Sequence, residues 1–124
     1  IARGGKGTIS MIRHLKKGGF LALLVDQDSH SGKSIKFLGQ AARTTIAPAE
    51  IALRYDLPLV PVFAVRQLNG RDIELEYEEP IKHTDPIKMT NEINTRIGKR
   101  IHKNPEQWYW LHNRWKVDSG CTSK

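Results

Sequence analysis

The stretch Phe20-Leu-Ala-Leu-Leu-Val-Asp26-Gln27-Asp28 determines how the rest of this sequence is interpreted. Six consecutive apolar residues are typical of a strand that is buried on both faces of a sheet. The run ends at two carboxylates and an amide, and a polar loop with Gly32 and Lys33 follows. Because ligands in open α/β sheets bind just beyond the carboxyl ends of the strands, we expect Asp26, Gln27 and Asp28 to form one wall of a functional site.

Hydrophobic periodicity predicts further strands and helices around this run. Beside a strand over 20–25, strands are expected over 59–66 and 72–78, and helices over 8–17, 45–55, 87–103 and 105–113. The strand over 72–78 alternates apolar residues with an acidic row, which we expect to face solvent. The predicted fold class is therefore α/β, with a small mixed sheet of at least three strands flanked by helices.

The aromatic segment near the end of the chain carries both apolar and cationic residues. Trp108, Leu111 and Trp115 are spaced so that they share one face of the helix expected there, and we expect that face to pack in the core. The polar residues between them are expected nearer a functional surface; they are His112, Arg114 and Lys116.

Length and charge limit the classes of partner. The 124 residues are most simply one domain, and 20 Lys and Arg against 13 Asp and Glu leave a net charge of +7. This excess favours an anionic partner, either nucleic acid, an anionic membrane face or an acidic protein. The single Cys121 excludes an internal disulfide framework and fits a reducing compartment. No apolar run approaches the roughly 20 residues that span a bilayer.

The same motifs allow other interpretations. A nucleotide-triphosphate loop at Gly32-Lys33-Ser34 is rejected, because position 27, where the motif needs glycine, is Gln. The pair Asp26-x-Asp28 could hold a divalent cation, as in metal-dependent glycosyltransferases, or could cap backbone amides at the end of the strand. The tryptophans interleaved with basic residues could stack on bases in a nucleic-acid-binding module. The residues alone leave these alternatives open.

Five blocks of residues follow one another in a distinctive order. They are Ile1-Ala-Arg3, Asp26-Gln27-Asp28, Lys36-Phe37-Leu-Gly39 followed by Thr44-Thr45, Pro58-Leu-Val-Pro61-Val-Phe, and Pro105-Glu106-Gln107-Trp108-x-Trp110-x-His112-x-Arg114-Trp115-Lys116. Together they resemble the C-terminal half of the bacterial lipid A biosynthesis acyltransferases, the lauroyl- and myristoyl-transferases of the lysophospholipid acyltransferase superfamily. The resemblance implies that residues 1–116 are the C-terminal portion of a larger acyltransferase-type α/β domain and that 117–124 are a polar tail.

The resemblance also implies an activity and a location. The family transfers a fatty acyl chain from acyl carrier protein, or from acyl-CoA, to a hydroxyl of a phosphorylated lipid A precursor, at the cytoplasmic face of the Gram-negative inner membrane. We therefore expect an O-acyltransferase of lipopolysaccharide biosynthesis that needs no cofactor or metal. Its expected partners are the acyl donor, the phosphorylated acceptor and an anionic membrane surface, and not nucleic acid.

The family's catalytic histidine lies in a His-x-x-x-x-Asp/Glu motif, which this sequence does not contain. The residues five positions after the five histidines are Gly19, Ile35, Lys88, Gln107 and Val117. We therefore expect a fragment that lacks the catalytic pair, is inactive in isolation and forms a homodimer through the surface that truncation exposes.

The family blocks also imply a set of substrate-binding residues. Arg3 matches an arginine that engages an acceptor phosphate or transition-state charge, and residues 26–28 match a block that shapes the acceptor pocket. The full expected set is Arg3, Asp26, Gln27, Asp28, Lys33, Phe37, Gly39 and Thr45.

Overall fold

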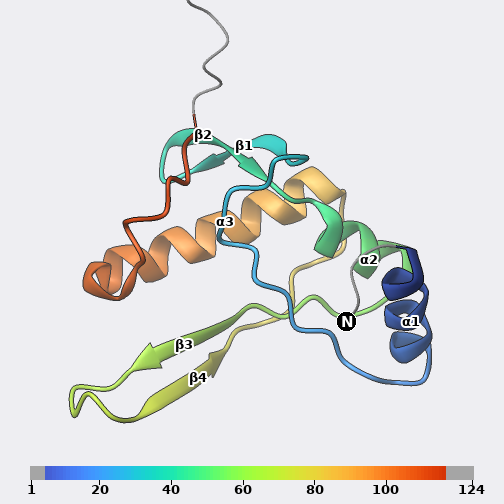
Figure 1. The fold of residues 1–124 in the computed structure, drawn as a ribbon, viewed down its shortest axis with the longest axis horizontal. Coiled ribbons are helices and arrows are strands. Elements are labelled where there is room, and N and C mark those ends of the chain that lie inside the picture. Colours follow the sequence, from blue (N-terminus) through green and yellow to red (C-terminus); the bar gives the residue numbers. More distant parts are fainter. Residues whose placement is uncertain (1–4, 117–124) are drawn as a thin grey trace, which may run out of the picture.

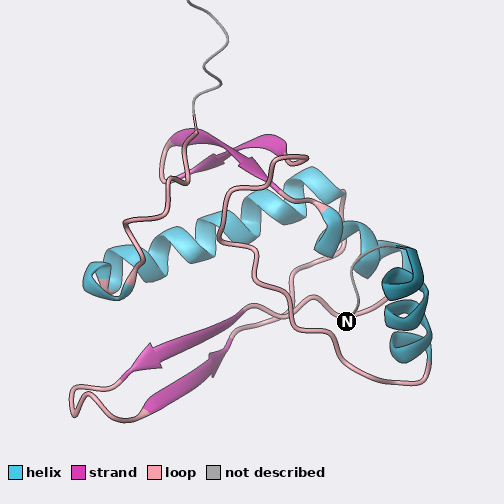
Figure 2. Ribbon diagram, in the orientation of Figure 1, coloured by secondary structure: helices cyan, strands magenta, loops and turns pink. Residues whose placement is uncertain are grey.

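The structure is a computed structural model that describes residues 5–116, in which two β-hairpins and three α-helices follow one another along the chain (Figure 1). The elements are α1 (Gly5–Lys16), β1 (Lys33–Phe37), β2 (Gln40–Thr44), α2 (Ala47–Tyr55), β3 (Val62–Arg66), β4 (Ile73–Tyr77), α3 (Pro86–Lys103) and a short 3-10 helix η1 (Pro105–Gln107). The α/β fold class is confirmed. The strands form two separate two-stranded antiparallel sheets, β1–β2 and β3–β4, and α3 lies between them in the view of Figure 2.

Residues 20–25 do not form the strand that the sequence predicts. The run is irregular, and the side chains of Phe20 and Leu24 are 86% and 88% exposed. A strand with two apolar faces is stable only between neighbouring strands and covering layers, and none of the strands within residues 5–116 pairs with this run. The expected mixed sheet over 20–25, 59–66 and 72–78 is therefore wrong in its first member.

Helix α3 forms where its cap and periodicity predict it. Asp85 is the N-cap, and its Oδ1 accepts hydrogen bonds from the backbone N–H groups of Ile87 and Lys88. The four-residue stripe that the sequence predicted is buried; its members are Met89, Ile93, Ile97 and Ile101. It packs against Phe37 of β1 and Ala42 of β2 in the hydrophobic core. None of the helices within residues 5–116 is long and apolar enough to cross a membrane.

The β1–β2 hairpin was not expected from the sequence. Leu38 and Gly39 connect its strands, and both have positive φ angles, 49° and 84°. Two left-handed residues in succession match the twist of a tight hairpin, but Leu at the first position is an uncommon signal. The register aligns Phe37 with Gln40 and Lys33 with Thr44.

The β3–β4 hairpin packs with the opposite face from the one expected. Glu76 and Glu78 turn toward α3, where both form salt bridges with Arg100 and Glu78 also with Arg96. The guanidinium of Arg100 also lies 4.7 Å from the ring centroid of Phe63. Glu76 and Glu78 are therefore neutralised by the arginines of α3, whereas Asp72 and Glu74 face solvent as expected. The apolar row of β4 is exposed; it consists of Ile73, Leu75 and Tyr77.

The helix expected over 105–113 ends after η1. Beyond Gln107 the chain is a series of turns, so Trp108, Leu111 and Trp115 do not share a helical face. Trp108 and Trp115 nevertheless both pack on Phe37, each with its ring centroid 5.7 Å away, as the core interpretation expected. Leu111 is 86% exposed, and that part of the expectation is wrong.

Candidate functional site

The candidate site is centred on the carboxylate of Asp28. Its side chain is only 5% exposed, and it is held by Arg43 of β2 in a bidentate ion pair. Arg43 Nε donates to Oδ1 at 3.0 Å, and Nη2 donates to Oδ2 at 2.9 Å. Both oxygens are therefore engaged in the strongest geometry that a guanidinium offers a carboxylate.

The C-terminal segment reaches the same residue from a distant part of the sequence. The backbone N–H of Asp28 donates to Nε2 of His112 at 2.8 Å. Because Nε2 accepts here, the neutral imidazole carries its proton on Nδ1. Lys116 places Nζ 3.8 Å from Oδ2 of Asp28. Two of the motifs found in the sequence, 26–28 and 105–116, thus meet at one residue.

Arg114 adjoins this cluster through the backbone of Arg43 and is fully buried. Its Nη1 donates to the backbone carbonyl of Arg43 at 2.7 Å, and its Nη2 donates to Oγ1 of Thr44 at 2.6 Å. Its guanidinium carbon lies 4.7 Å from the ring centroid of Phe37, and its Nε finds no hydrogen-bond partner among the residues described. Burial lowers the pKa of Arg114, and the charges of Asp28 and Asp26 oppose that shift.

Asp28 holds neighbouring segments together as a carboxylate anion and is poorly suited to accept a proton from a substrate. Hydrogen bonds from Arg43 lower the pKa of Asp28, whereas burial raises it. The positive charges of Arg43, Lys116 and Arg114 lower the pKa further. A general base needs a pKa near the working pH and a free oxygen facing the substrate, whereas both oxygens of Asp28 already accept hydrogen bonds from Arg43.

The other expected site residues lie in varied surroundings. Gln27 and Lys33 are exposed, and Asp26 is half-buried. Thr45 is also half-buried, and its Oγ1 accepts a hydrogen bond from the backbone N–H of Ala47 at 3.3 Å. Phe37 is a core residue, and Arg3 lies outside the described residues.

Sequence reasoning did not single out Arg43. The only local signal is the alternation of buried residues at 42 and 44, which places residue 43 on the opposite face of a strand. Its pairing with Asp28 depends on the β1–β2 hairpin, because the backbone N–H of Ser29 donates to the carbonyl of Arg43 at 3.1 Å and docks the loop on β2.

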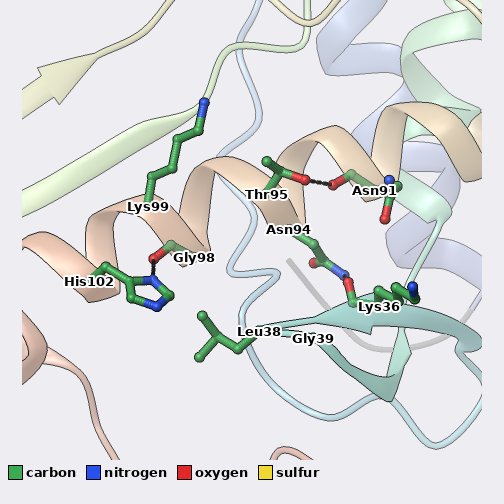
Figure 3. A pocket seen from close by; sticks show the side chains of 9 residues that line it. All are labelled: Lys36, Leu38, Gly39, Asn91, Asn94, Thr95, Gly98, Lys99 and His102. Atoms are coloured by element: carbon green, nitrogen blue, oxygen red, sulfur yellow. Dashed lines mark hydrogen bonds between the residues drawn. The ribbon is translucent and has the colours of Figure 1, made fainter.

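Gly39 lies in a separate groove between α3 and the β1–β2 turn (Figure 3). The groove has a volume of about 360 Å³ and is lined by Lys36, Leu38, Gly39, Asn91, Asn94, Thr95, Gly98, Lys99 and His102. Leu38 and Asn94 extend into the space between turn and helix, whereas Lys99 points away from the turn (Figure 3). Asn94 donates to the carbonyl of Lys36 at 2.9 Å.

The carboxylates of this region are not arranged to bind a divalent cation. Within residues 5–116 no three or more His, Cys, Asp or Glu side chains gather as a metal site would require. The two oxygens of Asp28 face the positive charges of Arg43 and Lys116, which repel a metal ion. The structure therefore gives no support to the metal-dependent glycosyltransferase alternative.

Comparison with known proteins identifies the class to which this fold and site belong. The family model for the bacterial lipid A biosynthesis acyltransferases matches residues 2–117, which include every residue of the Asp28 cluster. The chain belongs to this family, and the resemblance noted in its sequence is confirmed.

Among characterised proteins, the chain is similar to two phosphatidylinositol mannoside acyltransferases. That of Mycolicibacterium smegmatis is 25% identical over 99 residues, which cover 79% of this chain and 33% of the relative. That of Mycobacterium tuberculosis (strain CDC 1551) is 20% identical over 109 residues, which cover 87% of this chain and 34% of the relative. The chain thus spans about a third of the length of these relatives.

Proposed function

We propose that this chain belongs to an O-acyltransferase that moves a fatty acyl group from acyl carrier protein or acyl-CoA to a hydroxyl of a phosphorylated lipid, a lipid A precursor. Family membership supports acyl transfer in general, and the relatives named above are acyltransferases. In this proposal residues 1–116 form the C-terminal portion of the acyltransferase domain. The protein works at the cytoplasmic face of the inner membrane, where its charge of +7 suits an anionic lipid surface.

The observation that carries the proposal is the charge of the Asp28 cluster. Arg43, Arg114 and Lys116 contribute three positive charges, against the carboxylates of Asp28 and Asp26. One positive charge is left over, and Lys116 is 51% exposed and can reach a ligand. A surplus cation held at a fixed position is the recognition chemistry that a phosphate group requires.

The expected site residues then divide by their surroundings. Asp26, Gln27 and Lys33 are accessible enough to contact the acceptor directly. The buried Asp28 and Phe37 position Arg43, Arg114 and the tryptophans, and Thr45 and Gly39 shape the ends of β2 and of the hairpin turn. Arg3 is proposed to engage the acceptor phosphate or transition-state charge.

The chemistry requires a base that these 124 residues do not supply in the family's motif. The acceptor oxygen attacks the thioester carbonyl, a C–O bond forms, the C–S bond breaks, and the hydroxyl proton passes through a base to the leaving thiolate. None of the five histidines is followed at the fifth position by Asp or Glu. The His-x-x-x-x-Asp/Glu pair is therefore proposed to lie in another part of the polypeptide, and this chain to be inactive without it.

The proposal is tested on the protein expressed from the complete reading frame that contains this sequence. That protein should transfer a labelled acyl group from acyl carrier protein or acyl-CoA to a phosphorylated glycolipid. Replacing Lys116→Ala should raise KM for the phosphorylated acceptor about tenfold, the effect of one charge-assisted contact of about 1.4 kcal/mol. KM for the dephosphorylated acceptor should stay unchanged.

Lys88→Ala is the matched control, because Lys88 is also exposed and ion-paired but lies at the start of α3, away from the cluster. Absence of transfer to any lipid, or a reading frame without the catalytic motif, would overturn the proposal.

A further inference from the structure

The outer face of the β3–β4 hairpin is apolar and uncovered. The register pairs Val62 with Tyr77 and Ala64 with Leu75, which places these four side chains on the same face. Leu75 is 54% exposed, and its neighbours on that face are exposed as well. The other face is fixed against α3 by the salt bridges of Arg96 and Arg100, so the hairpin cannot bury its apolar side by turning over.

The run 20–25 is a second uncovered apolar element. Phe20, Leu23 and Leu24 are all exposed, although six consecutive apolar residues are typical of a buried strand. A hairpin of two strands is marginally stable in water, and further strands or a covering layer normally stabilise it. Both elements therefore have the composition of sheet interior without the neighbours that a sheet interior needs.

We infer that the outer face of β3–β4 and the run 20–25 are a docking surface for the rest of a family-length polypeptide, which adds at least one strand beside 20–25 and a covering layer on β3–β4. The chain corresponds to a third of the relatives it matches, so a segment of sufficient length is available in proteins of this family. This inference rests on the proposed function, because it takes the chain to be one part of a larger acyltransferase domain.

Backbone hydrogen bonding distinguishes this occupant from an anionic bilayer. The register places Glu74 opposite Val65, on the face away from the apolar row, and Arg66 opposite Ile73, on the side of the apolar row, so charge on this face does not select the occupant. Lipid tails offer the backbone no hydrogen-bond partner. A polypeptide layer has to match the apolar row, and its backbone can pair with the N–H and C=O groups of 21–25, for which residues 5–116 supply no backbone partner.

Hydrogen exchange followed by mass spectrometry tests the inference on two forms of the protein. In the protein from the complete reading frame, the amides of 21–25 should exchange at least tenfold more slowly than in the 124-residue chain. Equal exchange in the two forms would overturn the inference, as would a reading frame that adds no strand-forming segment. Protection that rises with the concentration of the 124-residue chain, together with a dimeric mass, would make a second copy the occupant and would also overturn it.

Substitutions provide a second readout that does not depend on activity. Leu75→Lys and Phe20→Lys should leave the Tm of the 124-residue chain unchanged, because both side chains already face solvent, and should lower the Tm of the longer protein by several degrees. Leu111→Lys is the control, because Leu111 is at least as exposed as Phe20 and Leu75 but lies outside both elements; it should be neutral in both forms. Neutrality of Leu75→Lys and Phe20→Lys in the longer protein would contradict the inference.

The two proposals fail separately. Protection of 21–25 without acyl transfer would overturn only the proposed function. Acyl transfer by a protein in which 21–25 exchange freely would overturn only the docking surface.

Discussion

Arg43 holds both carboxylate oxygens of Asp28, with Nε 3.0 Å from Oδ1 and Nη2 2.9 Å from Oδ2. The pair joins the loop after 20–25 to strand β2, and the C-terminal segment completes it through His112 and Lys116. Three segments that are far apart in the sequence are therefore tied together at one buried carboxylate. The integrity of the candidate site depends on this ion pair.

Replacing Arg43→Met should strongly destabilise the folded chain. The substitution removes the bidentate partner and leaves the nearly buried charge of Asp28 with the more distant charges of Lys116 and Arg114. Breaking a buried ion pair from one side typically costs about 3–5 kcal/mol. Urea unfolding should show this loss, whereas the control Arg71→Met, at an exposed position in the β3–β4 turn, should stay within about 0.5 kcal/mol of the parent chain. An equal, small effect of both substitutions would contradict a central role for the pair.

The same ion pair predicts how stability changes with pH. The pKa of Asp28 is lower in the folded chain than its ordinary value of 3.8, mainly because Arg43 donates hydrogen bonds to it. The unfolded state therefore binds more protons in acid, so the contribution of Asp28 is complete above about pH 3.8 and is lost as the pH falls through the folded-state pKa. Urea unfolding of the parent chain and of Asp28→Asn should give a constant difference from pH 5 to 7 and a shrinking one below pH 3.8. A difference that does not change with pH would refute this account.

Sequence reasoning succeeded where local chemistry is sufficient. Asp85 and Pro86 define the start of α3, and a four-residue apolar stripe defines its buried face, so the boundaries and burial of α3 were predictable. Predictions from the sequence were wrong where the structure of a segment depends on residues far away in the chain. The pattern of β4 separates an apolar from an acidic face, but only the arginines at 96 and 100 of α3 decide which face turns inward. Likewise, six apolar residues at 20–25 indicate a strand, but strand pairing needs a neighbour that residues 5–116 do not supply.

The candidate site was predictable in part for the same reason. Asp28 stands out at the end of an apolar run, and the motif around His112 and Lys116 stands out by composition. Nothing in local spacing reveals that these two motifs meet, because 84 positions separate Asp28 from His112. Arg43 could be recognised only after the β1–β2 register was known.

Gly32 allows the loop after Asp28 to approach β2 closely. A Cβ atom at residue 32 would lie 2.7 Å from the backbone N, C and O atoms of Thr44, which cannot yield without moving the strand. Gly32→Ala should therefore separate loop from strand, weaken the Asp28–Arg43 pair and destabilise the chain by about 1–3 kcal/mol. Gly98→Ala is the matched control, because a Cβ atom at residue 98 would meet only a terminal methyl of Leu38, at 3.2 Å. Alanine also has a higher helix propensity than glycine, so this substitution stabilises α3. Thermal unfolding should rank Gly32→Ala clearly below Gly98→Ala, and the reverse order would contradict the close approach.

Arg100 fixes the orientation of the β3–β4 hairpin, and its removal should release the hairpin without unfolding the core. Arg100 forms salt bridges with Glu76 and Glu78. Hydrogen bonds to these carboxylates raise the pKa of Arg100, whereas burial lowers it by a smaller amount. Arg100→Met removes the arginine partner of Glu76 and leaves Glu78 with Arg96, so amides of β3 and β4 should exchange faster while those of α3 remain protected. Because the pairs are partly exposed, added salt should reproduce part of this effect in the parent chain.

Lys99→Met is the control, because Lys99 lies one position earlier on α3 and takes part in none of the salt bridges found within residues 5–116; it should leave hairpin exchange unchanged. Equal exchange in the two variants would show that the hairpin is held by Phe63 and by the Gln107 hydrogen bonds to the backbone of Arg66 instead.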